Sequence, residues 1–513
     1  MEAQIRFRWL GVAGIEPLIS ITLLKLFLHL ATNNRLLGYG YFRDEFYYLV
    51  CAERLAFGYV DLPPLAPFLL SVNRRLVGDS IFALRLLPAV AGAGTVLLAG
   101  LMARRLGGGR FAQALAALAV TIAPVHLVIN GFFSPNAFEV LLWTASAYIL
   151  LLLLQRDSPR LWLWVGVIAG LGLQMKHTMA LFGLGMLLGL LLTPTRRYLR
   201  SKWLWLGGAI AMLIFLPNLI WQVQHDRLSL EFYAHSNLVK NVPTPPGELM
   251  LTQILVLHPL TFPIWLAGLY FLLFAADGRP YRMLGWVYLV ILSVLIVGQS
   301  SRPDRLAGAY PMLLAPGALV VERAVGQRRM LATGALLVLA LGGVVTLPLG
   351  VPVLPPETTA RYAAMLGVSV QIEQGKTGSL PQHFADRLGW EEMVTTVAEV
   401  YHSLPPDERT QATILAGNYG QAGAVDFLGR ELGLPRAISG HNNYFLWGPG
   451  DTSGEVVISI GLSEGDLREF FEDVRWAATA HCDYCLEQER PVYVAKRLRF
   501  PIQEVWPQVK HYD

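Results

Sequence analysis

The chain has 513 residues, of which 54% are hydrophobic and only 15% are charged, and its net charge is +4. Soluble domains carry about 25% charged residues, so this composition argues against an ordinary soluble protein. The small net charge, with basic residues confined to short loops and no basic arm, also argues against a nucleic-acid-binding protein.

The first apolar run extends from Ile15 to Leu30, and no small-residue cleavage site follows it before the acidic residue 44. We therefore expect a retained signal anchor rather than a cleavable signal peptide. A membrane span needs about 20 apolar residues, and the apolar pattern predicts eleven spans. They lie near residues 14–32, 81–103, 111–130, 136–154, 161–176, 178–193, 203–221, 251–275, 283–299, 306–322 and 330–350.

Alternate loops between these spans are rich in arginine and lysine, which predicts that they face the cytoplasm. An odd number of spans then places the N-terminus in the cytoplasm and the segment after residue 350 outside. The predicted outward segments are residues 33–80, 131–135, 176–177, 222–250 and 300–305.

The long outward loop at 33–80 has two stretches with helical character. Residues 46–55 show helical apolar spacing, and prolines begin the stretch 63–70, as is common in the first turn of a helix. We expect both to be amphipathic helices lying along the outer membrane surface.

The pattern changes after a proline-rich boundary at residues 351–356. Helical and strand-like stretches alternate from there on, which predicts a small α/β domain. The sequence therefore predicts a polytopic α-helical membrane domain over 1–350 and an extracytoplasmic α/β domain over 351–513. The predicted helices are 390–402, 422–429 and 464–471, and the predicted strands are 412–416, 455–460 and 491–495.

The acidic pair Asp44-Glu45 directly follows the first apolar run and is surrounded by aromatic residues. A carboxylate at a membrane face costs several kcal/mol unless it is solvated, paired or used. Asp44 suits a catalytic base, and the alternative is a carboxylate that caps an interfacial helix. Glu45 is a second catalytic candidate that either orients substrate or pairs with Arg43.

Several ordered segments resemble the GT-C glycosyltransferases of family 39, which include the protein O-mannosyltransferases and the ArnT-like enzymes. The likeness extends over nearly the whole chain. The segments are Asp44-Glu45 with Tyr47-Tyr48, Asp61-x-Pro63-Pro64, Phe132 to Glu139, Gly172 to Thr178, Tyr310 to Ala315, Asn418 to Ala424 and Ser439 to Pro449.

This resemblance implies a GT-C fold, a polyprenyl-phosphate-linked sugar donor, and inverting transfer at the outer face of the cytoplasmic membrane. The first-loop aspartate of the family matches Asp44, which implies a general base at that position. Asn136 stands where many relatives have aspartate, and Leu62 where many have histidine. The resemblance favours a lipid or polysaccharide acceptor in the cell envelope, such as lipopolysaccharide, and leaves a protein acceptor as the alternative.

Other residues of these segments are candidates for substrate binding. Asp61 suits a sugar hydroxyl, or else it is a turn residue before the prolines. Glu139 lies one helical turn after Asn136, so both can face one side of a helix, with Arg85 or Lys176 as a partner for Glu139. The tyrosines of the first outward loop, Tyr47 and Tyr48, complete this group.

Cationic candidates for a donor phosphate lie in two outward segments. Lys176, beside His177, either binds phosphate or snorkels to the membrane interface. Arg302 and Arg305 lie in an outward loop, where positive charge is disfavoured, so we expect them to bind phosphate.

The sequence predicts no metal site, because Cys482-x-x-Cys485 with His481 offers too few ligands for zinc. A divalent cation stays open as a cofactor. The two cysteines are expected as a disulfide or as free thiols, and three cysteines in total exclude a disulfide framework. An aromatic group, Tyr444, Phe445 and Trp447, forms either a sugar-stacking platform or an ordinary core.

Two other classes of protein compete with the transferase. A transporter would use the intramembrane charges as a pathway, but it usually shows inverted repeats, and none is visible here. A non-catalytic membrane scaffold that binds glycans would tolerate loss of Asp44, whereas an enzyme would not.

Overall fold

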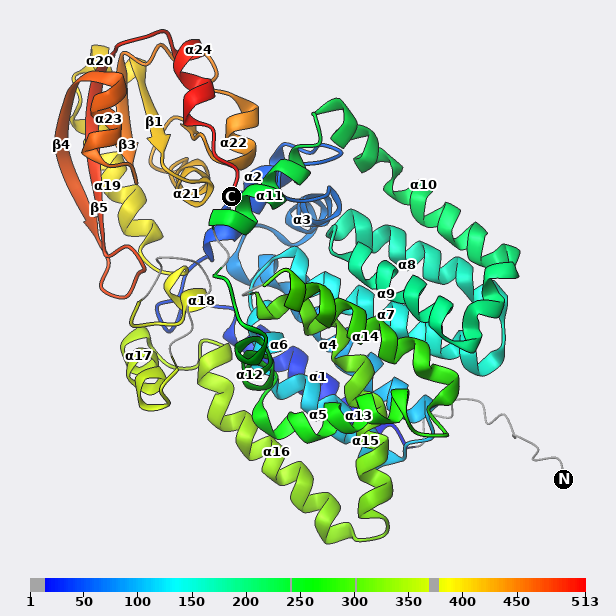
Figure 1. Ribbon diagram of the computed structural model, residues 1–513. Helices are drawn as coiled ribbons and strands as arrows, with labels where there is room; N and C mark the ends of the chain where they lie inside the picture. Colours follow the sequence, from blue (N-terminus) through cyan, green and yellow to red (C-terminus); the bar gives the residue numbers. More distant parts are fainter. Residues whose placement is uncertain (1–13, 240–241, 300–301, 369–377) are drawn as a thin grey trace, which may run out of the picture.

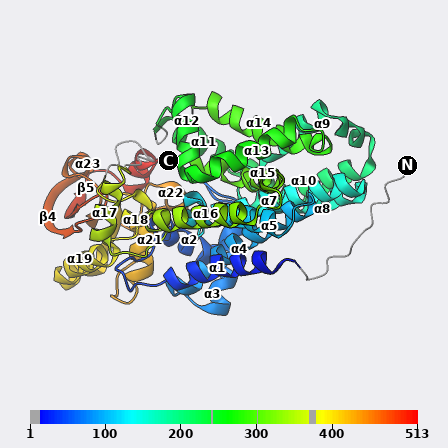
Figure 2. The ribbon, with the colours of Figure 1, turned by 90° about the horizontal axis from the view of Figure 1, so that it is seen from below.

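The computed structural model describes residues 14–239, 242–299, 302–368 and 378–513. Helices α1 to α16 form one part of the molecule, and a five-stranded sheet with its own helices forms the other (Figure 1). Viewed at a right angle, the two parts lie end to end, with the sheet beyond one end of the helices (Figure 2). The chain is thus a polytopic membrane protein with a sheet-containing C-terminal region.

Among the described residues, five helices are long and apolar enough to cross a membrane, and two sharply bent helix pairs raise the number to at most seven. The five are α4 (Ile81–Arg105), α7 (Pro135–Arg156), α10 (Lys202–Gln224), the stretch Arg279–Val297 that contains α14 (Arg282–Val297), and α16 (Arg329–Gly350). The bent pairs are α9 (Met179–Leu192) with η2 (Pro194–Arg200), and α12 (Pro246–Val256) with η3 (Pro259–Thr261) and α13 (Phe262–Leu273).

The count of eleven spans is therefore not confirmed, although each predicted position holds a helix. The remaining positions carry helices of at most 17 residues. At 1.5 Å per residue these fall short of a hydrocarbon core about 30 Å thick. They are α1 (Glu16–Thr32), α5 (Arg110–Ile122) with α6 (Pro124–Ile129), α8 (Trp162–Met175) and α15 (Pro311–Val325).

Small residues let the helices of the bundle approach closely, as is usual within membranes. A Cβ on Gly268 of α13 would meet the carbonyl oxygen of Leu313 in α15, and a Cβ on Gly317 of α15 would meet that of Ile264. Tyr310 and the first residues of α15 are consequently fully buried.

Residues 33–80 contain two helices, as predicted: α2 (Arg43–Glu53) and α3 (Leu65–Val77). Helix α3 is amphipathic and exposes Phe68 and Leu76. The expectation of a surface helix is wrong for α2, because all its residues from Glu45 to Ala52 are buried. Helix α3 packs on one side of α2 and α21 (Tyr419–Leu428) on another.

The sheet has the strand order β2-β1-β3-β5-β4. The first three strands in this order are parallel, and β5 and β4 add an antiparallel hairpin. The predicted strands are present as β1 (Ala412–Ala416), β3 (Val456–Ile460) and β5 (Glu489–Leu498), whereas β2 (Ala437–Ile438) and β4 (Phe471–His481) are additional.

Helices cover both faces of this sheet, as an α/β region requires. The predicted helices are present as α19 (Trp390–Ser403), α21 and α23 (Glu464–Phe470). Met393 of α19 and Ile414 of β1 share a core with Phe46 of α2, while α23 packs on the opposite face. One hydrophobic core therefore joins the sheet region to the helix that carries Asp44.

Candidate functional site

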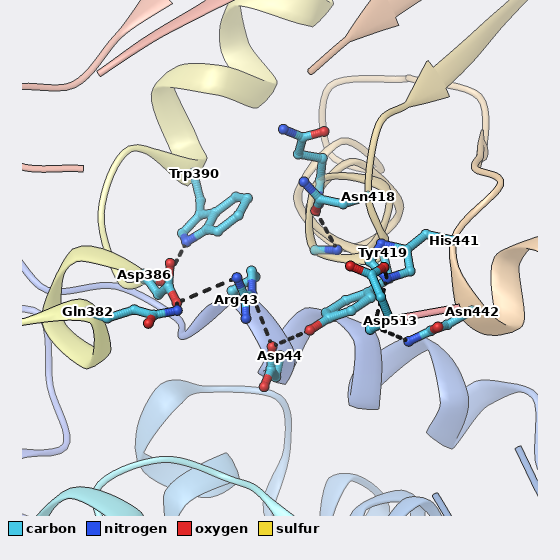
Figure 3. Close-up of polar contacts among 12 residues, drawn as sticks. Arg43, Asp44, Gln382, Asp386, Trp390, Asn418, Tyr419, His441, Asn442 and Asp513 are labelled. Atoms are coloured by element: carbon cyan, nitrogen blue, oxygen red, sulfur yellow. Dashed lines mark hydrogen bonds and ion pairs between the residues drawn. The ribbon is translucent and has the colours of Figure 1, made fainter. Parts of the chain in front are cut away.

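The Asp44 carboxylate lies in the first turn of α2, where the sheet region meets the helical part (Figure 3). Its Oδ1 accepts a hydrogen bond of 2.9 Å from the Tyr419 hydroxyl and one of 3.2 Å from Nε of Arg43. Both donors converge on Oδ1, and Figure 3 shows Oδ2 pointing away from them. The side chain is 25% exposed, so the carboxylate is held on one oxygen and accessible on the other.

Arg43 is fixed by the segment just before α19. Its backbone N–H donates to the Asp386 carbonyl oxygen at 2.9 Å, and its guanidinium lies 3.8 Å from the Asp386 carboxylate. The Trp390 indole N–H also donates to the Asp386 carbonyl oxygen at 2.9 Å, and the Gln382 amide donates to its carboxylate at 3.3 Å (Figure 3). Asp386 thus holds Arg43, one of the two hydrogen-bond donors to Asp44, in place.

Asp44 opens on a cavity of about 530 Å³. Acidic and basic side chains from separate segments meet around it, and it contains nine of the eleven predicted site residues. These nine are Asp44, Tyr47, Tyr48, Asp61, Asn136, Lys176, His177, Arg302 and Arg305. Residues more than 250 positions apart in the chain therefore form one polar chamber.

Lys176 follows the end of α8, and its ammonium group is positioned by α7. Nζ donates to Asn136 Oδ1 at 2.6 Å and to Glu139 Oε2 at 3.0 Å. Glu139 also accepts a hydrogen bond from the Thr178 hydroxyl. Of the two partners predicted for Glu139, Lys176 is confirmed. Because Asn136 is neutral, Glu139 supplies the carboxylate in this pair of hydrogen-bond acceptors for Lys176.

Arg302 and Arg305 border the same cavity at η5 (Pro303–Ala309). Between them, Asp304 accepts a hydrogen bond of 3.2 Å from the Asn136 amide. Burial lowers the pKa of Arg305, and the positive charge of Arg302 adds to that shift. Two adjacent cations in a partly desolvated chamber form a favourable environment for an anion.

The tyrosines of α2 point polar ends into the chamber. The Tyr47 hydroxyl donates to Asp61 Oδ1 at 2.7 Å. Burial raises the pKa of Tyr47 and of Tyr48 well above 10, and the nearby charges of Asp61 and Asp44 raise them further. Both tyrosines therefore keep their protons at pH 7, and the Tyr47 hydroxyl serves as a hydrogen-bond donor.

His177 is satisfied by protein partners on both ring nitrogens. Nδ1 lies 3.1 Å from the Tyr233 hydroxyl of α11 (Leu228–Val239), and Nε2 lies 3.0 Å from the Asn218 amide oxygen of α10. Burial lowers the pKa of His177 below its usual 6.5, so the ring is neutral at pH 7. Its contacts position α11 as one wall of the cavity.

Glu45 is placed apart from this chamber. It is fully buried and forms two hydrogen bonds with the Arg85 guanidinium of α4, at 2.9 and 2.8 Å. It also accepts the backbone N–H groups of Phe42 at 2.8 Å and Phe133 at 2.7 Å. Arg85, proposed as a partner of Glu139, therefore pairs with Glu45 instead. We correct the expected catalytic role of Glu45 to a structural one, because no substrate hydroxyl can reach this enclosed carboxylate.

The structure also bears on the alternatives for the two C-terminal cysteines and for the aromatic group near residue 445. Cys482 and Cys485 form a disulfide. Tyr444 is buried and its hydroxyl donates to Asp426 at 2.9 Å, while Phe445 stacks on Trp506 and Trp447 lies under Arg54. These contacts favour an ordinary core over a sugar-stacking platform.

Sequence reasoning gave Tyr419 no role in the site, although its hydroxyl is a direct partner of Asp44. The signal was present in the segment Asn418 to Ala424. Asn418 caps α21 by accepting the N–H groups of Gly420 and Gln421 at 3.0 Å. The unpredicted polar residues that line the cavity include Tyr233, Asp304, Asn442 and Asp513.

The sequence is similar to known glycosyltransferases over part of its length. Residues 61–221 match the family model of the dolichyl-phosphate-mannose-protein mannosyltransferases. The lipid A galacturonosyltransferase RgtD of Rhizobium johnstonii is 26% identical over 260 residues, which is 50% of this chain. That match spans only 54% of the length of the relative.

Solved structures match over nearly the entire chain. ArnT from Cupriavidus metallidurans in the apo state superposes with a TM-score of 0.62 at 15% identity, covering 93% of this chain and 97% of that one. The same protein bound to undecaprenyl phosphate gives 0.59 at 16% identity, with the same coverage. The oligosaccharyltransferase of Archaeoglobus fulgidus gives 0.52 at 12% identity, covering 82% of this chain and 64% of that one. The resemblance predicted from the motifs is thereby confirmed: the chain has the fold of the ArnT-like GT-C membrane glycosyltransferases.

Proposed function

We propose that this protein transfers a sugar from a polyprenyl-phosphate donor to a lipid or polysaccharide acceptor, with inversion at the anomeric carbon. The observation that carries the proposal is the polar chamber itself. An accessible carboxylate oxygen of Asp44 shares it with Lys176, Arg302 and Arg305. A base and a set of phosphate-binding cations are what this reaction needs.

In the proposed reaction Asp44 Oδ2 takes the proton of the acceptor hydroxyl. The acceptor oxygen attacks the anomeric carbon from the face opposite the phosphate, and the bond from that carbon to the phosphate oxygen breaks. The polyprenyl phosphate leaves with the electron pair. Tyr419 and Arg43 orient the base through Oδ1, and Asp61 is placed to accept a sugar hydroxyl.

The cations are proposed to hold the leaving phosphate. Lys176 approaches as a point charge, and the arginines supply forked donors that match phosphate oxygens. A relative of the same fold binds undecaprenyl phosphate, and another relative acts on lipid A. Both support a lipid-linked donor and an envelope lipid or glycan as acceptor.

We further propose a location in the cytoplasmic membrane, with the chamber and residues 351–513 on the outer side and residues 1–350 as the membrane domain. The alternating basic loops support this orientation. The disulfide between Cys482 and Cys485 supports it too, because disulfides persist in oxidising compartments.

The test is sugar transfer from radiolabelled polyprenyl-phosphate donors in membranes that carry wild type, Asp44→Asn or Asp79→Asn at matched expression. Asp79 is a suitable control because its exposed carboxylate pairs with Arg74 at the surface. Loss of a general base lowers the rate about 10²- to 10⁴-fold, so we expect that loss in Asp44→Asn only. Equal transfer by Asp44→Asn and wild type would refute the role of Asp44 as the general base. No transfer above empty membranes from any donor would refute the proposal that the protein is a glycosyltransferase.

A further inference from the structure

We propose that His441, His511 and Asp513 hold a divalent metal ion, for which Zn²⁺ is the best chemical match. One ligand atom from each of the three side chains lies within 4.8 Å of the others. Asp513 borders the chamber, but the inference does not depend on the proposed transfer chemistry.

The backbone brings the two histidines together. His441 precedes α22 (Asn442–Trp447), and a parallel bridge pairs it with His511. The Asn442 N–H donates to the His511 carbonyl oxygen at 3.1 Å, and the His511 N–H donates to the Gly440 carbonyl oxygen at 3.0 Å. The imidazole centroids are 4.4 Å apart. Two separate stretches of chain are therefore held in register, with their rings side by side.

The tautomer of His511 suits a ligand. Its Nδ1 lies 3.0 Å from the Val509 carbonyl oxygen, which can only accept a hydrogen bond, so Nδ1 carries the proton. Nε2 then presents its lone pair to an ion. A backbone carbonyl on the other ring nitrogen is the usual support for a metal-binding histidine.

Asp513 supplies the third ligand. Its Oδ1 lies 2.8 Å from Nε2 of His441, and the two side chains are only 21% and 7% exposed (Figure 3). Nε2 of His441 also lies 3.0 Å from the Asp513 main-chain oxygen, which accepts its hydrogen bond when Nε2 carries a proton. A metal ion replaces that proton, and the coordinating nitrogen and oxygen then move apart by a few tenths of an ångström to accommodate bonds of about 2.0–2.2 Å.

The donor set indicates which metal fits. Two imidazole nitrogens and one carboxylate oxygen suit Zn²⁺, whereas Mg²⁺ and Ca²⁺ prefer all-oxygen sites. Three protein ligands leave a fourth position for water.

The site lies next to the chamber. The His441 ring is 4.6 Å from the Tyr419 ring, whose hydroxyl contacts Asp44, and Asp513 and Asn442 line the cavity. Lys510 ties the same segment to α11 through an ion pair of 2.7 Å with Glu231. A bound ion would clasp residues 509–513 against α22 and so fix this wall.

The experiment measures Zn²⁺ content and Zn²⁺ affinity of the full-length protein, purified in detergent with any affinity tag removed. Wild type is compared with His511→Gln, Asp513→Asn and the control His481→Gln. The control removes a histidine that also pairs with an aspartate, Asp483 at 2.9 Å, but on the exposed surface. Co²⁺ substitution gives a spectroscopic readout of tetrahedral coordination.

We expect one equivalent of Zn²⁺ and a Co²⁺ ligand-field spectrum in wild type and in His481→Gln. Losing a ligand should weaken binding more than about 100-fold, and Zn²⁺ should raise the unfolding temperature of wild type but not of the two site variants. Near-wild-type circular dichroism of His511→Gln shows that it is folded. Absence of Zn²⁺ binding in wild type, or equal binding in all four proteins, would overturn the site.

Discussion

The carboxylates of Asp44 and Glu45 are neighbours in sequence but point from α2 into two different environments. Asp44 opens on the chamber, whereas Glu45 is sealed against Arg85 and two backbone N–H groups. Consecutive residues of a helix are about 100° apart around its axis, so an acidic pair at this point naturally divides between two environments. The division separates a residue suited to chemistry from one that holds the site together.

Replacing Glu45 with alanine should destabilise the protein by about 3–5 kcal/mol, because Arg85 would be left as an unpaired buried charge. The measurement is the unfolding temperature and the yield of folded protein in detergent. Glu53→Ala is the matched control, since Glu53 lies on the same helix but pairs with Arg74 and Arg430 nearer the surface. Exposed pairs contribute up to about 1 kcal/mol, so equal losses in both variants would contradict the structural role.

Replacing Tyr419 with phenylalanine removes the hydroxyl that donates to Asp44 and leaves the ring in place. We expect kcat to fall roughly tenfold, the cost of one hydrogen bond to a charged group, with little change in KM for the donor. Tyr401→Phe is a suitable control, because Tyr401 lies near the C-terminal end of α19 and does not line the cavity. A change confined to KM would argue that Tyr419 binds substrate rather than orients the base.

Lys176→Gln should raise KM for the polyprenyl-phosphate donor by roughly tenfold or more, because the ammonium contact with phosphate is lost. Initial rates over a series of donor concentrations in proteoliposomes provide the measurement. Lys496→Gln serves for comparison, since Lys496 is bound to Glu408 away from the cavity. An unchanged donor KM would leave Lys176 with a structural role toward Glu139.

Asn136→Asp introduces the residue type that the family resemblance implies at this position. In this chain a second carboxylate would meet Lys176 and repel Asp304, whose oxygen lies 3.2 Å from the Asn136 amide. We expect donor KM to rise about tenfold, since one such unfavourable contact costs on the order of 1 kcal/mol. Asn136→Ala separates lost hydrogen bonds from added charge, and a lower KM in the aspartate variant would reverse our interpretation.

His383 predicts a sensitivity of stability to acid. Its Nε2 lies 2.9 Å from the Leu349 carbonyl oxygen at the end of α16, and burial, with the charge of Arg387, lowers its pKa to about 3. The unfolded chain protonates this ring near the usual 6.5. Between these values the unfolded state binds more protons, so stability falls as pH decreases from 6.5 toward 3.

His383→Gln should flatten that decline, measured as unfolding temperature against pH. The exposed His402, whose Nε2 also meets a carbonyl oxygen at 2.9 Å, provides the control substitution His402→Gln. An identical slope in wild type and His383→Gln would exclude His383 as the source.

Local patterns were enough to predict the positions of most helices, the three central strands and nine of the chamber residues. What they missed depends on distant contacts. The burial of α2 follows from α21, which is formed some 370 residues later, and the partner of Asp44 is separated from it by 375 positions. Glu45 finds Arg85 40 positions away. Neither pairing has a period or a spacing that a sequence pattern can reveal. The span count is not confirmed for a related reason, since short apolar helices and long spans look alike in hydropathy alone.

Gly423 lets α21 lie directly against α2, since a Cβ there would come within 2.8 Å of the Phe46 backbone. The sheet region and the segment that contains α2 are therefore packed so closely that each needs a matching surface on the other. A chimera that exchanges residues 351–513 between two such proteins should fail to assemble unless the segment that contains α2 is exchanged with it. Any shift of acceptor preference achieved by recombination should then follow both segments together.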